Sequence, residues 1–408
     1  MVRSMLHHDH QSLPDGPRAC RPDELNEVLE LANSVMRPDA VQDLRTDYPL
    51  VFNAEQVANI RIIRWAGSVA SEVPVAPREI VLGADTIRVG IIGPTATRPD
   101  CRRRGFGTRC IEDCIELMQR GGLPLSVLWT VPATFPFYQR MGWHPVASQG
   151  SMYPISHDDA PRFRGPAVDV APFEPAATDH LTGVRRIYDA MAHRVKRSDH
   201  DCRALFTLPR VRTVIARQGA EVVAYLVVGE ARNKSGLIEG GGDKQALAAL
   251  VARALQEDSR RAIRQAVTVP GLSVLGELLE ERLPGRCRPV EEAAGVGHQM
   301  MRINSLAGFL GSIRGWLRSL DLCRRMELGC RETGECFAVT PTQSDVATER
   351  IEPRETVMLS RAELTALFFG VPETASPEVP RKGWPPEIAA TCHGHFPRPF
   401  PLHELDHC

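Results

Sequence analysis

The sequence has almost no net charge, with 49 Lys and Arg against 50 Asp and Glu among its 408 residues. A chain with this balance creates no global field that would draw it to nucleic acid or to an anionic membrane surface. We therefore expect small molecules or other proteins as partners, and we expect neither nucleic acid nor a membrane.

Long apolar runs are also missing. The first 16 residues, MVRSMLHHDHQSLPDG, lack the apolar core of a signal peptide, and no later stretch approaches the roughly 20 apolar residues of a membrane span. The 11 cysteines are scattered and odd in number, which suits reduced thiols better than a disulfide framework. These absences predict a soluble cytoplasmic protein, and we assign no disulfide bridge.

The cysteine and histidine groups lack the spacing of a standard metal site. His7, His8 and His10 could ligate a metal, but residues 1–16 show no strand or turn pattern and are expected to form a disordered tail. A second group near the other end matches no standard four-ligand zinc pattern and consists of Cys392, His393 and His395. No metal site is predicted.

The chain is long enough for two or three domains. Residues 21–35 have the apolar spacing of an amphipathic helix, and residues 57–65, 80–82 and 87–92 are typical of strands. A helix follows from residue 108, then a strand over 125–129 and a short helix over 135–140. This order predicts an α/β layer architecture for a first domain, residues 17–150.

The rest of the chain predicts two further domains. A Pro- and Asp-rich linker is expected over residues 151–175. Residues 165–300 repeat the order of the first domain, with a helix after residue 181, a β-rich segment over 211–228 and a helix over 244–255. Residues 301–408 begin with a helix over 306–320, followed by a strand over 336–340 and a helix over 360–369, capped by Ser360 and ended by Gly370. The Pro-rich segment after residue 370 is irregular.

The segment from Arg102 to Gly107, RRRGFG, joins a predicted strand to a predicted helix. This order places backbone N–H groups and the positive end of the helix around one point, which suits a pyrophosphate. Gly105 and Gly107 leave room for an anion, and three arginines can contact its oxygens. The alternative interpretation is a solvated surface loop, with Tyr138 as a packed core aromatic.

The context of this loop makes it more specific. About thirty residues later comes the run Phe137-Tyr138-Gln139-Arg140-Met141-Gly142-Trp143. With Pro99-x-x-Arg102-Arg103-Arg104-Gly105-Phe106-Gly107, it makes residues 18–146 resemble a GNAT acetyltransferase domain. The layout of the whole chain resembles the enhanced intracellular survival (Eis) family of aminoglycoside acetyltransferases. That resemblance implies an α/β (α+β) fold with two tandem GNAT-like domains, the second without the loop, and a smaller sterol-carrier-protein-like α+β domain.

The resemblance also implies a function, namely acetyl transfer from acetyl-CoA to a primary amine of an aminoglycoside- or polyamine-like polycation or of a lysine. It implies a homo-oligomer, because the proteins of that family form hexamers. Tyr138 would act as general acid toward the coenzyme A thiolate. The carboxylate of Cys408 would be the base, although a group with a pKa of roughly 3.5 takes a proton from an ammonium only through water or after a large shift.

The implied cofactor-binding residues lie in three short segments of the first domain. They are Thr95, Ala96, Thr97, Arg102, Arg103, Arg104, Gly105, Phe106, Gly107, Thr108, Ala133 and Thr134. Glu404 and Asp406, close to Cys408, could supply negative charge for a polyamine. Trp65, Phe135 and Trp143 could wall a pocket or belong to the core.

A binding or regulatory protein is the alternative, in which the chain binds acetyl-CoA or a lipid without turnover. The complete phosphate loop favours the enzyme, because a pure scaffold has little reason to keep it.

Overall fold

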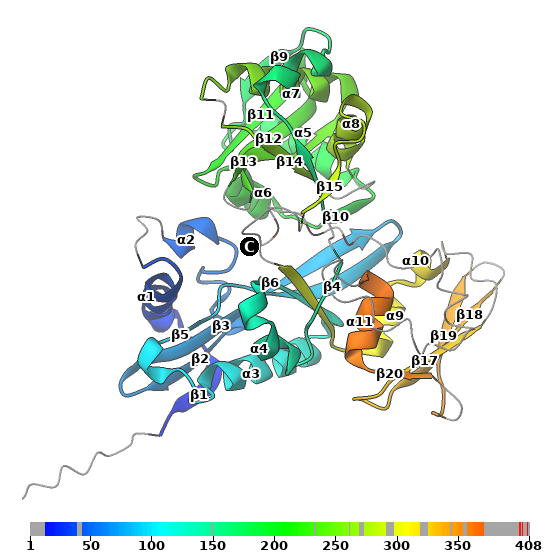
Figure 1. Cartoon of the computed structure of the whole chain (residues 1–408). Coiled ribbons are helices and arrows are strands. Elements are labelled where there is room, and N and C mark those ends of the chain that lie inside the picture. The colour runs from blue at the N-terminus through cyan, green and yellow to red at the C-terminus, as the bar shows by residue number, and fades with distance from the viewer. Residues whose placement is uncertain are drawn as a thin grey trace, which may run out of the picture. The chain divides into compact units, whose positions relative to one another are not determined.

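A computed structural model describes most of the chain (Figure 1). The described residues are 13–38, 43–147, 150–231, 234–260, 262–268, 273–290, 298–318, 325–342, 345–353 and 357–370, with Phe400, Leu402 and Asp406. The chain forms two compact units, of which unit 1 comprises Met1–Ala76 and Ile92–Leu117 and unit 2 comprises Pro77–Ile91 and Met118–Cys408.

Unit 1 is built on antiparallel strands. β1 (Asp15–Ala19) pairs with β2 (Ile60–Trp65), β2 pairs with the first part of β3 (Ser68–Leu82), and the short β5 (Ala96–Thr97) pairs with β3. Figure 1 shows α1 (Leu25–Met36) and α3 (Phe106–Arg120) on opposite sides of these strands. The shorter helices of unit 1 are η1 (Pro22–Glu24), α2 (Leu44–Asp47), η2 (Val57–Asn59) and η3 (Pro99–Cys101).

Both long helices lie where the 3.6-residue period predicts them. In α1 the residues Val28, Leu31 and Ala32 are buried, and in α3 Cys110 and Cys114 are fully buried. Burial raises the pKa of the Cys110 thiol to about 12. Both cysteines are small core residues of this helix.

The first sheet of unit 2 contains a parallel pair. The second part of β3 is followed across the sheet by β4 (Asp85–Ile92), β6 (Leu125–Thr130), β16 (His298–Ile303) and β7 (His144–Pro145). β4 runs parallel to β6, with Val89 opposite Leu125. β10 (His193–Val195) pairs with the end of β3. β16 pairs with β6 although about 170 residues separate them in the chain.

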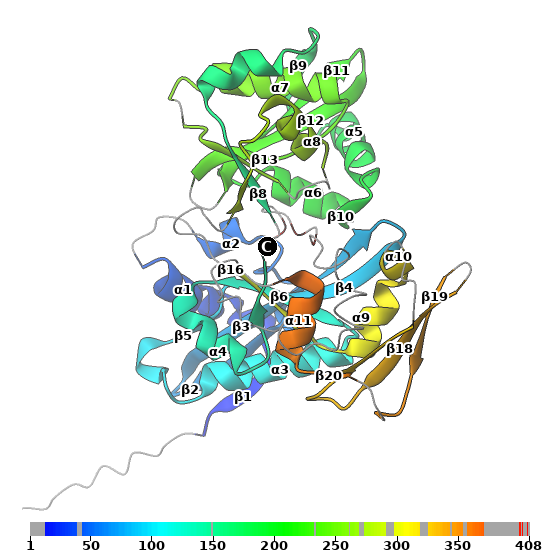
Figure 2. The ribbon, with the colours of Figure 1, turned by 45° about the vertical axis from the view of Figure 1, so that its right-hand side comes forward.

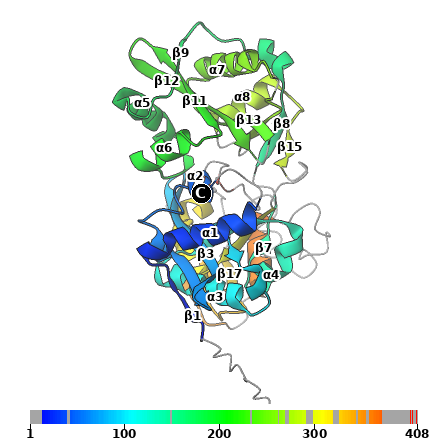
Figure 3. The same ribbon diagram turned by 90° about the vertical axis from the view of Figure 1, so that its left-hand side faces the viewer.

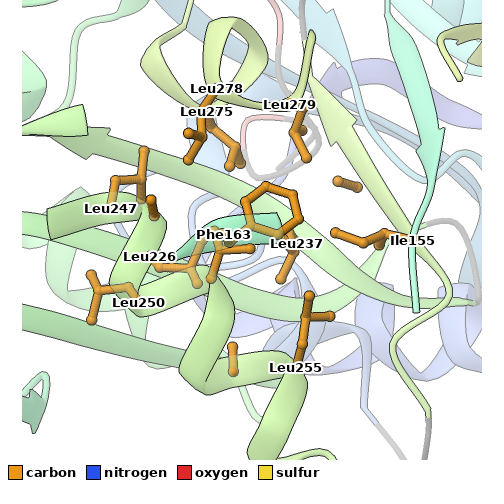
Figure 4. Close-up of a cluster of buried hydrophobic side chains, with 14 of the residues drawn as sticks. Ile155, Phe163, Leu226, Leu237, Leu247, Leu250, Leu255, Leu275, Leu278 and Leu279 are labelled. Carbon is orange, nitrogen blue, oxygen red and sulfur yellow. The ribbon is translucent and has the colours of Figure 1, made fainter. Parts of the chain in front are cut away.

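A second sheet in unit 2 carries helices on both faces (Figures 2 and 3). Its order is β15 (Arg288–Pro289), β8 (Ser151–Pro154), β14 (Gln265–Thr268), β13 (Lys234–Gly242), β12 (Glu221–Ala231), β11 (Val211–Gln218) and β9 (Asp169–Pro172). One core lies under α5 (Thr178–Asp189) and α6 (Asp199–Phe206). The other lies under α7 (Lys244–Glu257), α8 (Val274–Arg282) and η5 (His157–Phe163), and Figure 4 shows its leucines around Phe163.

The expectation of a linker over residues 151–175 is wrong. This segment supplies β8, η5 and β9 to the second sheet and its core, and Phe163 is fully buried. Its polar residues serve local structure, since Asp159 accepts from the backbone N–H of Ser156 in a capping box. The segment is rich in capping and turn residues, and its composition therefore resembles that of a linker although it is part of the sheet.

The last part of unit 2 is a four-stranded sheet with three helices. The strand order is β19 (Val346–Arg350), β18 (Cys336–Pro341), β17 (Met326–Cys330) and β20 (Val357–Leu359). The predicted helix over residues 306–320 divides at Ile313, whose φ of −119° ends α9 (Leu306–Ser312) before α10 (Arg314–Arg318). The predicted final helix is confirmed as α11 (Arg361–Phe369), with Ser360 as its cap and Gly370 at φ +77°.

Candidate functional site

The chain between β4 and α3 is fixed along β3. The N–H of Gly93 donates to the carbonyl of Pro74 at 3.0 Å, and β5 places Thr97 opposite Ser71. The hydroxyls of Ser71 and Thr97 are 2.8 Å apart, and the Thr95 hydroxyl donates to the carbonyl of Gly93 at 3.2 Å. The predicted segment Thr95–Thr97 is therefore an ordered extended chain on unit 1.

Two residues of the arginine and glycine loop have positive φ. Arg103 has φ +64° and Gly105 has φ +79°, both in the left-handed region that favours glycine. A Cβ added at Gly105 would meet nothing within 4 Å. Glycine is therefore favoured here by backbone conformation, and the space beside it is open. Arg102 connects the loop to the preceding segment, since its Nε donates to the carbonyl of Thr97 at 3.4 Å.

The loop ends at the amino terminus of α3. The first backbone bond of this helix runs from the N–H of Arg109 to the carbonyl of Gly105 at 3.0 Å. The N–H groups of Phe106, Gly107 and Thr108 therefore have no acceptor within the helix, and the positive end of the helix dipole lies beside them. Three exposed arginines precede this end. The arrangement favours an anion with several oxygens.

An aromatic side chain supports the loop from β2. The guanidinium of Arg104 lies 4.3 Å from the centre of the Trp65 ring, and Phe106 packs against the same ring at 6.3 Å. Of the two interpretations left open for Trp65, its place beside the loop favours a site residue. Trp143, in contrast, is fully buried in the core of unit 2.

The remaining predicted residues lie together in unit 2. Ala133 and Thr134 belong to η4 (Pro132–Thr134), which leads directly into α4 (Phe135–Gln139) and Tyr138. The carbonyl of Tyr138 accepts from the N–H of Met141 at 3.0 Å and of Trp143 at 3.2 Å, so the backbone of the predicted acid is fixed. Its half-buried ring lies 5.0 Å from the ring of Phe137.

Arg302 on β16 is a supporting residue that the sequence did not indicate. Its Nε donates to the carbonyl of Met141 at 3.0 Å, and its guanidinium lies 5.5 Å from the centre of the Trp143 ring. Burial lowers its pKa to about 10. A Cβ at Gly142, whose φ is +93°, would lie 3.2 Å from Arg302 Nε. Gly142 is the glycine of the predicted Phe-Tyr-x-Arg-x-Gly-Trp element. Because it has no side chain, Arg302 can lie close to the backbone at this position.

Four features that the sequence singled out fall outside the described residues. They are Cys408, Glu404, the histidines of the first tail and the group Cys392, His393 and His395. Within the described ranges, no three His, Cys, Asp or Glu side chains are grouped to hold a metal ion. No helix in the same ranges is both long enough and apolar enough to cross a membrane.

A comparison with known protein families identifies the first domain. Residues 17–146 match the family of the acetyltransferase (GNAT) domain. These residues form a GNAT acetyltransferase domain. The prediction of an acetyltransferase is confirmed, and the donor of a GNAT domain is acetyl-CoA. No curated protein matches the chain.

Solved structures resemble this chain over nearly its whole length. A GCN5-related N-acetyltransferase from Kribbella flavida is 15% identical, with a TM-score of 0.69 over 94% of this chain and 97% of the other. Another from Anabaena variabilis is 14% identical, with a TM-score of 0.62 over 86% and 89%. Eis1 from Mycobacterium abscessus is 14% identical, with a TM-score of 0.61 over 96% and 99%. At these identities the similarity shows the fold, which confirms the predicted mixed α/β class.

Proposed function

We propose that this GNAT domain transfers an acetyl group from acetyl-CoA to a primary amine. The acceptor class is an aminoglycoside- or polyamine-like polycation or a lysine side chain. The observation that carries the proposal is the loop with φ +64° at Arg103 and φ +79° at Gly105, directly before the open end of α3. A non-glycine residue with positive φ directly before the start of a helix is typical of a ligand site.

In the proposed complex the loop holds the pyrophosphate of acetyl-CoA. The N–H groups of Phe106, Gly107 and Thr108 donate to its oxygens, and Arg102, Arg103 and Arg104 add charge-assisted contacts. The backbone of Thr95, Ala96 and Thr97 pairs with the pantetheine amides and offers an N–H to the thioester oxygen. Ala133 and Thr134 are the remaining residues that we propose to bind the cofactor.

The proposed chemistry is direct attack on the thioester. The neutral amine forms a bond to the carbonyl carbon, and the tetrahedral intermediate collapses with cleavage of the carbon–sulfur bond. The Tyr138 hydroxyl gives its proton to the departing thiolate. The proton of the amine passes to water.

The second sheet supports a tandem GNAT-like arrangement with one cofactor site. The order of elements in the first domain recurs in this sheet. There β2, β3, β4, α3 and β6 correspond to β11, β12, β13, α7 and β14. In both sets the strand before the helix is parallel to the strand after it, β4 to β6 and β13 to β14. At the start of α7, however, the Asp243 carboxylate accepts from the N–H of Ala246 at 2.8 Å. A carboxylate at this helix end repels phosphate. A Cβ at Gly242, the last residue of β13, would clash with the carbonyl of Val223 on the neighbouring strand β12, so the chain that enters α7 lies close against this strand.

Calorimetric titration with acetyl-CoA tests the cofactor site. Gly105→Glu places a side chain and a negative charge in the space that an anion would take, so binding should be lost. Gly219→Glu is the matched control, because Gly219 also has positive φ, at +62°, and also has nothing within 4 Å of a Cβ. The control should bind as the wild type does.

The same proteins test turnover. Release of free coenzyme A thiol in the presence of polyamines, an aminoglycoside or a lysine peptide should depend on Gly105 and not on Gly219. Acetyl-CoA binding without any acetyl transfer would favour the regulatory alternative. A wild type that binds no acetyl-CoA would contradict both the site and the mechanism.

A further inference from the structure

Two arginines meet beside the backbone of Gly142 in unit 2. A Cβ at Gly142 would lie 3.2 Å from Nε of Arg302, on β16, and 3.4 Å from Cδ of Arg361, at the start of α11. α11 packs against both β16 and β7 (Figure 2). The two side chains therefore reach the same point from elements that are distant in the sequence, next to the turn that follows Tyr138.

Arg302 is a buried cation whose hydrogen-bond acceptors are neutral. Its residue is 4% exposed, its Nε donates to the carbonyl of Met141, and its Nη1 donates to the side-chain oxygen of Asn304. The Trp143 ring covers one face of the guanidinium. Among the described residues no carboxylate forms an ion pair with Arg302, so much of the cost of burying its charge is not offset.

Arg361 brings a second positive charge to this point. Its Nε is buried and has no hydrogen-bond acceptor among the described residues. Its charge also acts on its neighbour, since burial is the main reason why the pKa of Arg302 falls to about 10 and the charge of Arg361 is the second reason. Two like charges thus lie together where one of them is almost fully buried.

The negative charge near this pair does not balance it. Glu332 is the carboxylate that acts on Arg302 among the described residues, and its two oxygens accept from the backbone N–H of Arg361 at 3.1 and 3.0 Å. His144 on β7 adds no charge at neutral pH, because burial lowers its pKa and Glu332 opposes this only in part. The described groups leave an excess of one positive charge.

We propose that Arg302 and Arg361 bind a small oxyanion, a phosphate or a carboxylate, beside Gly142. Guanidinium N–H groups match the oxygens of such anions in both charge and geometry. The anion gives the buried Nε of Arg361 an acceptor and balances the excess charge. This inference is independent of the proposed function, and it concerns unit 2, whereas the proposed phosphate loop belongs to unit 1.

Thermal unfolding of the full chain in sodium formate and in sodium phosphate tests the site. Every protein in this experiment carries Gly105→Glu, so that the phosphate loop does not take up the added anion, and this variant is the parent. Sodium chloride is replaced stepwise by the oxyanion at constant ionic strength. We expect the unfolding temperature of the parent to rise by about 2 °C when the oxyanion is about tenfold above its Kd.

Arg361→Gln removes one of the two like charges. At the lowest oxyanion concentration this variant should unfold at the same temperature as the parent or higher, because the repulsion with Arg302 is relieved. The parent should become the more stable protein as the oxyanion is added, since the variant should bind it at least tenfold more weakly. Arg361→Lys, which keeps the charge, should retain part of the response.

Arg331→Gln is the matched control. Arg331 lies in the same part of unit 2 and pairs with Glu363 at 3.5 Å, but its side chain is 61% exposed. Its response to the oxyanion should equal that of the parent. A response to phosphate alone would assign a phosphate as the ligand, and a response to formate alone would assign a carboxylate.

Two results would overturn the proposal. One is a parent whose unfolding temperature does not change when chloride is replaced by either oxyanion. The other is an Arg361→Gln variant that responds to the oxyanion as strongly as the parent and the Arg331→Gln control do.

Discussion

The guanidinium carbon of Arg104 lies 4.3 Å from the centre of the Trp65 ring, so an aromatic face on β2 holds one charge of the proposed phosphate loop. An arginine stacked in this way keeps its N–H edge available to an anion. The stack therefore restricts the side chain before the ligand arrives, and less conformational entropy is lost on binding.

Trp65→Ala should weaken acetyl-CoA binding by about two- to fivefold, the value expected for an exposed cation–π contact of about 0.5–1 kcal/mol. Trp65→Phe keeps an aromatic face and should lose less. Calorimetric titration of both variants measures this difference. Equal affinity in the alanine variant and the wild type would show that the stack contributes nothing to binding.

We expect the protein to be more stable with glycine at position 103 than with a residue that has a side chain. Replacing a left-handed residue by glycine relieves about 1–2 kcal/mol and costs about 0.4–1 kcal/mol of unfolded-state entropy. Arg103→Gly should therefore be more stable than Arg103→Ala by about 0.5–1 kcal/mol in urea unfolding. Both variants lose the same charge, so both should bind acetyl-CoA equally weakly.

Arg102 provides the control for this comparison. Its backbone is extended, with φ −64° and ψ 155°. Glycine relieves no strain there, and Arg102→Gly should be less stable than Arg102→Ala. The same order of stability at both positions would contradict the interpretation of Arg103 as strained.

The sequence predicted the elements whose apolar residues recur at a regular period. The helices with Val28 and Leu31, and with Cys110 and Cys114, were predicted because one face of each is buried. The first half of β3 was missed, because Ser71, a buried polar residue, and Pro74 interrupt the pattern of a buried strand. Periodicity finds a strand only where its buried residues are apolar.

The site was predicted only in its local part. The loop from Arg102 to Thr108 is continuous in sequence, and its glycine pattern could be recognised. Arg302 could not, because its partner Met141 lies 161 residues away along the chain. No short-range pattern marks a buried arginine whose acceptors come from distant segments.

Tyr138→Phe should lower kcat for amine acetylation by about 10²–10⁴-fold, the usual contribution of a general acid. Acetyl-CoA affinity should stay unchanged, because the phenylalanine ring keeps the packing against Phe137. Tyr153→Phe is the control, since the Tyr153 hydroxyl donates to Glu280 at 2.8 Å in the second sheet. Unchanged turnover in Tyr138→Phe would remove Tyr138 as the acid.

Glu72 on β3 is fully buried, and neither of its carboxyl oxygens has a hydrogen-bond partner among the described residues. Burial therefore raises its pKa well above the usual range, an effect that the neighbouring N–H of Ala96 opposes only in part. The folded protein keeps this proton at pH values where the unfolded chain, with a pKa of about 4.3, has lost it.

The sign of the pH dependence follows from this difference in bound protons. Above pH of about 4.3 the folded state holds more protons than the unfolded state, so the contribution of Glu72 to stability falls as the pH rises. The contribution of Glu72 to the free energy of unfolding falls by at most about 1.4 kcal/mol per pH unit, until the pH reaches the pKa of Glu72 in the folded state. Glu72→Gln stays neutral throughout, so its stability relative to the wild type should increase steadily from pH 5 to pH 8.

Urea unfolding of both proteins at pH 5, 6, 7 and 8 measures this trend. The control is Glu55→Gln, the same substitution at an exposed position in unit 1. Because only the difference between variant and wild type is used, the titration of all other groups cancels. A Glu72→Gln difference that stays constant with pH would mean that Glu72 is ionised in the folded protein, and its carboxylate would then have to be stabilised by a cation or by water.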